Sequence, residues 1–366
     1  MTTTTPEDSL YRMHPAARLL TLFVIISVLL TACVSRQEAP EERLGLIYPD
    51  DRPFPESRFT TVFGLTIHYR TWEPEVTLVG KMVLLHGIGG STYSFDRLVP
   101  HLQASGYAIA AIDLPGFGYS DPALKFEHTA ENRLELIWTL MDRLDTDDNQ
   151  FNPLSRWYVM GHQMGGEFAV WMANDRPGRI AGLVLVATLI GENRPGGKMA
   201  WFPPVRWGLR AWLNNSLYTA DGAREMLEGA YGQPPTEGAV DGYLAPLVRA
   251  DADRALVNFS RTVGPEVPDL AAVEVPLLFV WGSEDTWRSI EAGQLQAVQK
   301  PGSQFQVIEG AGHVPMDTHT EELAEVVTRW IALVASGAVR LAGSRMVVSR
   351  QDTQPGEAVL FSPPLP

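Results

Sequence analysis

Short apolar runs alternate with segments of helical spacing along most of this chain. The apolar runs span residues 82–85, 108–112, 157–160, 182–187, 277–281 and 306–308. Segments whose apolar positions recur every three to four residues lie between them, notably residues 130–144, 165–174 and 321–334. Continuous apolar strands are typical of a parallel sheet that is covered on both faces. The alternation therefore predicts an α/β fold with a mostly parallel central sheet flanked by helices.

Two further segments depart from this alternating pattern. β-Branched and aromatic residues on both sides of Gly64 predict an opening hairpin at residues 59–63 and 65–72. Between residues 191 and 264 strong strand runs give way to many aromatic residues and Gly/Pro turns, which indicates a mostly helical insertion. The predicted organisation is a core in two parts, residues 59–190 and 265–336, a helical cap at residues 191–264, and a partly disordered C-terminal extension at residues 337–366.

The N-terminus has a different composition. Arg12 and Arg18 precede an uncharged apolar run at residues 19–34, which is shorter than the roughly 20 residues that span a bilayer comfortably. A basic segment followed by such a run is typical of an export signal. Residues 30–33 read LTAC and resemble the lipobox of bacterial lipoproteins, in which the chain is cut before a cysteine that is then acylated, here Cys33.

This signal carries a prediction about location. We expect residues 1–33 to be a lipoprotein-type signal and membrane anchor, and residues 34–58, which lack an apolar period, to be a tether. The protein would then be membrane-anchored and extracytoplasmic, as a bacterial lipoprotein. The alternative is a retained single transmembrane anchor in which Cys33 is incidental.

Composition and charge exclude several classes of function. The chain has 366 residues, 45% of them hydrophobic and 20% charged, which is the balance of a globular protein. Its net charge of −14 and the lack of an evident basic patch argue against a nucleic acid partner. Cys33 is the only cysteine, so an intrachain disulfide is excluded, and the histidines show no metal-binding spacing. Nucleotide-binding glycine motifs are also missing from the sequence, so we expect neither a metal nor an organic cofactor.

Glycine-rich motifs follow three of the predicted strands. The sequences are HGIGGS at residues 86–91, DLPGFGYS at residues 113–120 and GHQMGG at residues 161–166. In open α/β sheets, ligands bind beyond the carboxyl ends of the strands. Glycine also lets backbone N–H groups approach a ligand oxygen closely. We therefore expect a functional site where these loops meet.

Together these motifs resemble the α/β-hydrolase superfamily over about residues 59–336, and in particular its capped esterases, carbon–carbon bond hydrolases, epoxide hydrolases and dehalogenases. The segment at residues 161–165 stands where that family has its GxSxG nucleophile elbow. The resemblance implies an oxyanion hole made by the backbone N–H groups of Ile88 and Met164.

The resemblance also implies the remaining catalytic residues. Asp285, after the strand at residues 277–281, takes the position of the acid, and His313 takes that of the histidine, in the family's chain order. Gln163 occupies the nucleophile position, where the family carries Ser, Cys or Asp. A carboxamide is a poor nucleophile because its nitrogen lone pair is delocalised, so His313 has no ionisable O–H or S–H to activate there.

Three functions remain open at this point. The first is a hydrolase of a small apolar ester or related substrate, in which His313 and Asp285 activate water and a backbone oxyanion hole binds the developing charge. The second is a catalytically impaired pseudoenzyme that binds a small apolar ligand at the cell envelope, because Gln163 replaces the nucleophile. The third is a structural or interaction role at the envelope.

Aromatic residues of the predicted cap are the candidates for substrate selection. Trp201, Trp207 and Trp212 are expected to line the pocket under the cap. An aromatic lining predicts a small, apolar or aromatic substrate rather than a sugar or phosphate ester. Nothing in the sequence predicts an oligomeric state.

Overall fold

The computed structural model describes residues 52–147, 151, 156–191, 202–338 and 347–350. The chain divides into two units, residues 1–46 and 47–366, and the first lies outside the described residues. Cys33, the signal at residues 1–33, residues 34–51 of the predicted tether and Trp201 are therefore predictions that fall outside the described residues, as do residues 351–366.

A nine-stranded sheet runs through the second unit, in the order β1-β2-β4-β3-β5-β6-β7-β8-β9. The strands are β1 (Ser57–Val62), β2 (Leu65–Trp72), β3 (Gly80–Leu85), β4 (Tyr107–Ile112), β5 (Trp157–His162), β6 (Ile180–Val186), β7 (Leu277–Gly282), β8 (Gln304–Ile308) and β9 (Val347–Arg350). β1 and β2 form an antiparallel hairpin, β2 pairs antiparallel with β4, and all other neighbours are parallel. The predicted mostly parallel sheet is confirmed.

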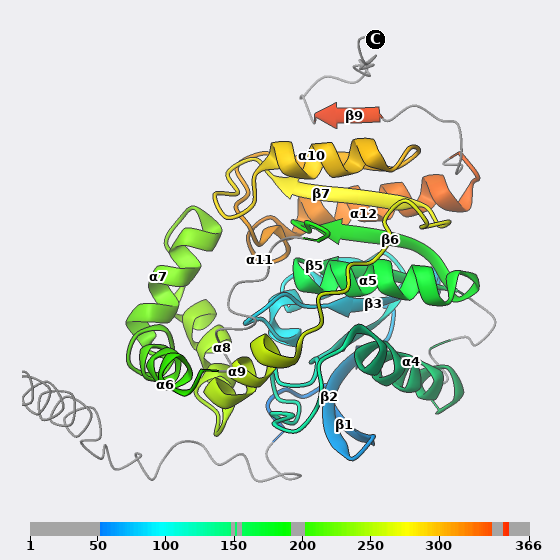
Figure 1. Cartoon of the computed structure of the whole chain (residues 1–366). Coiled ribbons are helices and arrows are strands. Elements are labelled where there is room, and N and C mark those ends of the chain that lie inside the picture. The colour runs from blue at the N-terminus through cyan, green and yellow to red at the C-terminus, as the bar shows by residue number, and fades with distance from the viewer. Residues whose placement is uncertain (1–51, 148–150, 152–155, 192–201, 339–346, 351–366) are drawn as a thin grey trace, which may run out of the picture. The chain divides into compact units, whose positions relative to one another are not determined.

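The register aligns the carboxyl ends of the central strands. Leu85 of β3 is paired with Gly161 of β5, and His162 of β5 with Val186 of β6. In Figure 1 the arrowheads of β6 and β7 point toward the cap helices, so the loops that leave these strands emerge under the cap. The glycine-rich loop after β3 and the turn after β5 are therefore neighbours.

Helices cover both faces of the sheet. α4 (Ala130–Asp147), α5 (Met164–Asp175) and α10 (Ile290–Gln299) pack on the face that carries Val83 and Leu85 of β3. α3 (Val99–Ala104) and α12 (Thr320–Ala335) pack on the face that carries Met82 and Leu84. Side chains alternate between faces along a strand, so the continuous apolar run of β3 supplies both layers of the core. Each fully buried large apolar side chain contributes about 1.5–3 kcal/mol.

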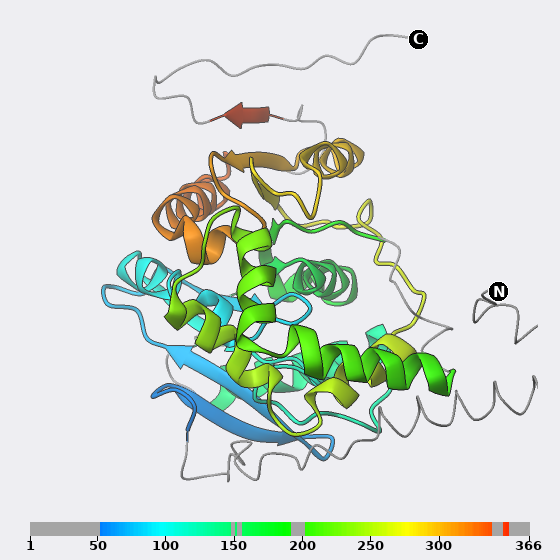
Figure 2. The same ribbon diagram turned by 90° about the vertical axis from the view of Figure 1, so that its left-hand side faces the viewer.

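Among the described residues, four α-helices lie between β6 and β7 and form the cap. They are α6 (Pro203–Trp212), α7 (Ala220–Tyr231), α8 (Glu237–Leu247) and α9 (Ala252–Thr262), with the short π-helical segment η4 (Leu213–Leu217) after α6. Figure 2 views the molecule from the side on which these helices lie. The part of the chain that the structure describes also contains the short elements η1 (Thr92–Phe95), η2 (Pro177–Arg179) and α11 (Pro315–Thr318).

The predicted strands and helices of the core are present, with ends shifted by no more than three residues. β9 is the main difference, because the sequence after residue 336 predicts only an extension. This strand is only four residues long and pairs in parallel with β8, so its position depends on a partner strand rather than on a local pattern. Within the described ranges, no helix combines the length and apolar character that crossing a membrane requires.

Candidate active site

Gln163 lies in a strained turn between β5 and α5. Its φ of 49° and ψ of −112° are unusual for a residue with a side chain. Glycines on either side make the turn possible: a Cβ on Gly161 would lie 2.3 Å from the Gly165 backbone, and one on Gly165 would lie 2.1 Å from the Leu85 carbonyl oxygen. The turn therefore presses the start of α5 against the end of β3, which is the geometry of a nucleophile elbow.

The side chain of Gln163 points into the glycine-rich loop. The backbone N–H of Ile88 donates a hydrogen bond to Gln163 Oε1 over 2.9 Å. A Cβ on Gly87 would lie 2.8 Å from the same oxygen, so only a glycine at this position leaves room for the side chain. The Ile88 amide, predicted to stabilise an oxyanion, is thus already engaged by a carbonyl oxygen of the chain itself.

Asp285 and His313 form a hydrogen-bonded pair. His313 Nδ1 lies 2.9 Å from Asp285 Oδ2, and both side chains are buried. Asp285 Oδ1 accepts from the backbone N–H groups of Trp287 and Arg288, each over 2.9 Å. With Nδ1 donating to Asp285, His313 Nε2 keeps its lone pair, and it has no hydrogen-bond partner among the described residues. The pair is therefore oriented to accept a proton at Nε2.

His162 connects this pair to the elbow. Its Nε2 lies 3.1 Å from the His313 carbonyl oxygen, and the two rings are 4.8 Å apart. The Gly87 backbone packs on both His162 and Gln163. Ile88, Gln163, His313 and Asp285, which the sequence placed at one site, are thus linked through adjacent contacts.

The other predicted site residues lie in different surroundings. Met164 is the first residue of α5 and is buried. Trp207 and Trp212 stand on the outer surface of α6, with 57% and 53% of their surface exposed. The ring of Trp287, which the sequence did not single out, lies 5.1 Å from the His313 ring and is 42% exposed. The loop after β7 therefore supplies an aromatic side chain next to His313.

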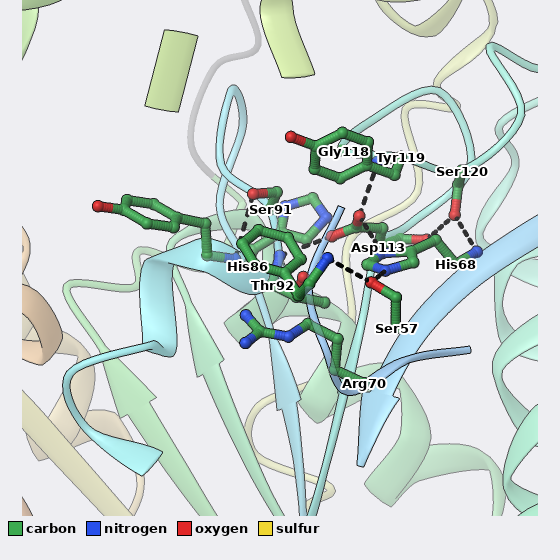
Figure 3. Close-up of polar contacts among 12 residues, drawn as sticks. Ser57, His68, Arg70, His86, Ser91, Thr92, Asp113, Gly118, Tyr119 and Ser120 are labelled. Atoms are coloured by element: carbon green, nitrogen blue, oxygen red, sulfur yellow. Dashed lines mark hydrogen bonds and ion pairs between the residues drawn. The ribbon is translucent and has the colours of Figure 1, made fainter. Parts of the chain in front are cut away.

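A Ser–His–Asp arrangement joins the first residue of β1, the middle of β2 and the residue after β4 (Figure 3). Ser57 Oγ is 2.7 Å from His68 Nε2, and His68 Nδ1 is 2.7 Å from Asp113 Oδ2. All three residues are 0% exposed. This order of atoms is that of a catalytic triad, but a substrate has no access to an enclosed hydroxyl.

Asp113 instead ties together the loops around the site. Its carboxylate accepts from the backbone N–H groups of Thr92 over 2.6 Å and Tyr119 over 2.7 Å, besides the His68 ring. Burial alone would raise the pKa of Asp113, but the neighbouring His68 ring and these hydrogen bonds lower it below its usual value. The sequence identified Asp113 only as a strand end, because its partners come from segments distant along the chain.

Arg133 contacts the elbow through the side chain of Met164. This fully buried residue of α4 donates from Nη1 to Met164 Sδ over 3.6 Å, and its Nε and Nη2 lie 3.2 and 2.9 Å from His128 Nδ1. Its guanidinium carbon also stands 4.5 Å from the centre of the Phe259 ring of α9, a cation–π contact. Arg133 therefore connects the elbow to the cap.

Buried histidines are expected to make the fold acid-sensitive. Burial lowers the pKa of His128 to about 2 and, with His313 nearby, that of His162 well below its usual value; burial also lowers the pKa of His86. Unfolded histidines take up protons near pH 6.5. The stability that these neutral histidines contribute is therefore full above about pH 6.5 and falls as the pH drops, by up to about 1.4 kcal/mol per pH unit and histidine.

This effect can be measured by urea unfolding of the protein between pH 7.5 and pH 5. His128→Asn removes one of the groups and should make the pH slope of the free energy of unfolding shallower by one proton. Asp317, whose pKa burial raises, acts in the opposite sense, so the comparison of the two proteins isolates the histidine contribution. Equal slopes in the two proteins would contradict the assignment of His128.

The arrangement has the parts of an acyl-transfer or hydrolytic site without a side-chain nucleophile at the elbow. Among the described residues, no group of three or more His, Cys, Asp and Glu side chains is placed to hold a metal ion. The site can transfer a proton at the His313 side chain and donate a hydrogen bond from the Ile88 backbone N–H.

Comparisons with known proteins agree with this geometry. The model of the alpha/beta hydrolase family matches residues 82–326. The chain is 24% identical to a 2-hydroxy-6-oxononadienedioate/2-hydroxy-6-oxononatrienedioate hydrolase of Cupriavidus pinatubonensis, over 68% of this chain and 86% of that protein. It is 26% identical to the pimeloyl-[acyl-carrier protein] methyl ester esterase of Neisseria meningitidis, over 67% and 91% of the two chains. A crystal structure of a membrane phospholipase A superposes with a TM-score of 0.59 at 21% identity, over 87% of this chain and 98% of that one. Since the family model spans well over half of its residues, the chain belongs to the alpha/beta hydrolase family.

Proposed function

We propose that the protein hydrolyses a small apolar ester, or a related bond, by direct attack of a water molecule activated by His313 and Asp285. The observation that supports this most is the oriented pair itself. His313 Nδ1 is held 2.9 Å from a carboxylate that two backbone N–H groups fix in place, and its Nε2 has no hydrogen-bond partner among the described residues. A histidine held in this way is suited to general-base catalysis.

The proposed reaction balances without a covalent intermediate. Water gives a proton to His313 Nε2 while its oxygen bonds to the substrate carbonyl carbon. The carbonyl oxygen becomes an oxyanion that the Ile88 N–H stabilises after displacing its hydrogen bond to Gln163, which is worth about 1 kcal/mol. The C–O bond then breaks, the proton returns from Nε2 to the alcohol, and an acid and an alcohol leave.

The substrate class follows from the surroundings and the relatives. The exposed part of the Trp287 ring beside His313 favours an apolar or aromatic group. The relatives named above are hydrolases of an ester and of oxodienedioates or oxotrienedioates, so carbonyl substrates are common to them. The proposal includes attachment to a membrane through residues 1–33, which rests on the composition of that segment.

A second candidate function is ligand binding without turnover. The hydrogen bond from the Ile88 N–H to Gln163 Oε1 favours it, because this bond occupies the amide that catalysis requires. A substrate carbonyl would have to compete with a side chain of the same molecule. In this case the pocket would hold a small apolar ligand, and Gln163 would prevent its hydrolysis.

Ester turnover of the full-length chain tests the proposal. We expect hydrolysis of short-chain chromogenic esters that His313→Ala lowers by at least about 100-fold, since it removes the general base. His319→Ala is the matched control, because this half-buried histidine directly precedes α12 and its Nδ1 lies 3.0 Å from Thr318 Oγ1, outside the His313–Asp285 pair. Turnover that survives His313→Ala would contradict the water mechanism. No turnover in the natural chain, together with turnover after Gln163→Ser, would favour the binding function.

A further inference from the structure

The outer face of the cap helix α6 is apolar throughout. Residues 203, 207 and 211 and residues 204, 208 and 212 follow the four-residue spacing that places side chains on one side of a helix. These six residues are the exposed ones of α6, and they are Pro203, Pro204, Trp207, Gly208, Ala211 and Trp212. Phe202, at the start of the helix, is also 59% exposed. Large aromatic side chains at the surface in such a group usually mark a contact surface.

A basic groove adjoins this face. A cavity of about 310 Å³ lies between α6 and α9, and Trp207 is part of its lining. The groove is also lined by four arginines, Arg206, Arg210, Arg254 and Arg261. The sequence, with its net charge of −14, shows no basic patch because these arginines come from two helices more than forty positions apart. The prediction that a local basic patch is missing is therefore wrong for the cap.

Two carboxylates offset part of this positive charge. Arg210 Nε lies 2.8 Å from Asp253 Oδ2, and Arg254 Nη1 lies 2.7 Å from Asp251 Oδ1. Neither aspartate lines the groove, whose remaining lining residues are neutral. Among the described residues the groove thus presents more cations than carboxylates to a ligand.

From this combination we infer that the α6–α9 surface docks on an anionic phospholipid bilayer, with Trp207 and Trp212 in the headgroup region and a lipid phosphate in the arginine groove. Tryptophan is favoured at the boundary between headgroups and acyl chains. Arginine binds phosphate oxygens through its planar fork of N–H groups, and basic residues are attracted to the surface of an anionic membrane. The apolar face and the basic groove share Trp207, so one bilayer can contact both at the same time.

Other partners fit this surface less well. A second copy would bring its own four arginines against the first set, and like charges would oppose the contact. A nucleic acid would be repelled by the net charge of −14 and would leave the Pro and Trp side chains of α6 without apolar contacts. A bilayer supplies an apolar layer beneath a layer of phosphates, which matches the arrangement of α6 and the groove.

Tryptophan quenching in vesicles tests the docking. The full-length chain is incorporated into phosphatidylglycerol or phosphatidylcholine vesicles whose acyl chains carry bromine, which quenches nearby tryptophans. Residues 1–51 contain no tryptophan, so an N-terminal anchor contributes no signal. We expect quenching in phosphatidylglycerol that the double variant Trp207→Phe, Trp212→Phe reduces at least about twofold. The matched control is Trp171→Phe, which changes the half-buried Trp171 of α5. It should leave the quenched fraction of the tryptophan emission unchanged.

The charge requirement is tested separately. Arg206→Glu with Arg254→Glu should reduce quenching in phosphatidylglycerol at least about twofold and bring it near the phosphatidylcholine value. Arg329→Glu changes an exposed arginine of α12 and should have no such effect. Quenching that is equal in the two lipids, or unaffected by the α6 and groove variants, would overturn the inference.

Two further results would assign the surface to something else. Inorganic phosphate added to the protein in detergent, with chloride of equal ionic strength as reference, should not change the tryptophan emission by as much as the vesicles do. A change of equal size would identify a site for soluble anions instead. Self-association in detergent that the Trp207→Phe, Trp212→Phe variant abolishes would identify a contact between copies.

Discussion

Replacing Gln163 by serine is expected to raise the kcat for small apolar esters by at least about 100-fold. The change frees the Ile88 N–H from Gln163 Oε1, which removes the cost of about 1 kcal/mol for displacing that hydrogen bond and accounts for the smaller part of the gain. It also places a hydroxyl at the elbow, which opens an acyl-enzyme route in addition to attack by water. Serine has to adopt the same φ of 49° as glutamine, so the variant gains no new backbone strain. The measurement is turnover of short-chain chromogenic esters by the purified protein.

Gln163→Ala separates the effect of freeing the Ile88 N–H from the effect of adding a hydroxyl. Alanine clears the Ile88 N–H without adding a nucleophile, so its gain over the natural chain measures the release of the oxyanion hole alone. Serine should then exceed alanine, and adding His313→Ala to Gln163→Ser should remove the extra rate, because the serine hydroxyl needs a base. A folded Gln163→Ser protein that is no faster than the natural chain would show that Ile88 and His313 are not aligned for catalysis.

Much of this site follows from local sequence features. The apolar runs fix where each strand ends, and the carboxyl ends of parallel strands meet at one edge of the sheet. Strand ends alone therefore predict that the segments which follow these strands lie together. The family resemblance singles out Ile88, Gln163, Asp285 and His313 within those segments. The glycines around Gln163 indicate a turn that is too close-packed for side chains, and the structure confirms this at Gly161 and Gly165. Local patterns suffice here because each of these residues comes soon after its own strand.

The features of the site and the cap that the sequence did not predict all depend on contacts between segments distant along the chain. The contact between Gln163 Oε1 and Ile88 joins residues 75 positions apart and depends on the rotamer of one side chain. The arginine groove combines α6 with α9, and neither helix is basic enough alone to indicate it. Ser57 and His68 lie in a hairpin whose sequence pattern predicts two strands but no polar partner. Asp113, which bonds to His68, follows the end of β4. Sequence periodicity reports which face of an element is buried, but it does not identify the partner of a buried polar group.

Removing the carboxylate of Asp113 is expected to lower the free energy of unfolding by about 3–5 kcal/mol. In Asp113→Ala the N–H groups of Thr92 and Tyr119 and the ring of His68 lose their acceptor inside the protein. A buried donor left without a partner costs about 1–3 kcal/mol. Thr92 begins η1, directly after the glycine-rich loop, so the loss should also loosen the loop that carries Ile88. Urea unfolding followed by tryptophan emission measures the effect.

Ser57→Ala is the matched control for the same cluster. It removes a hydroxyl that bonds to His68 Nε2 and accepts from the Phe54 N–H, and it leaves every hydrogen bond of the Asp113 carboxylate intact. The two lost hydrogen bonds should together cost about 2 kcal/mol. It should also leave ester turnover unchanged, because Ser57 is enclosed by the fold. Loss of turnover in a stably folded Ser57→Ala protein would mean that the buried Ser57–His68–Asp113 arrangement takes part in catalysis. Equal costs for the Ser57 and Asp113 variants would show instead that the carboxylate does not hold the loops together. The expected result, a large stability loss at Asp113 and a smaller one at Ser57, assigns this triad-like arrangement to the fold and leaves the chemistry to His313 and Asp285.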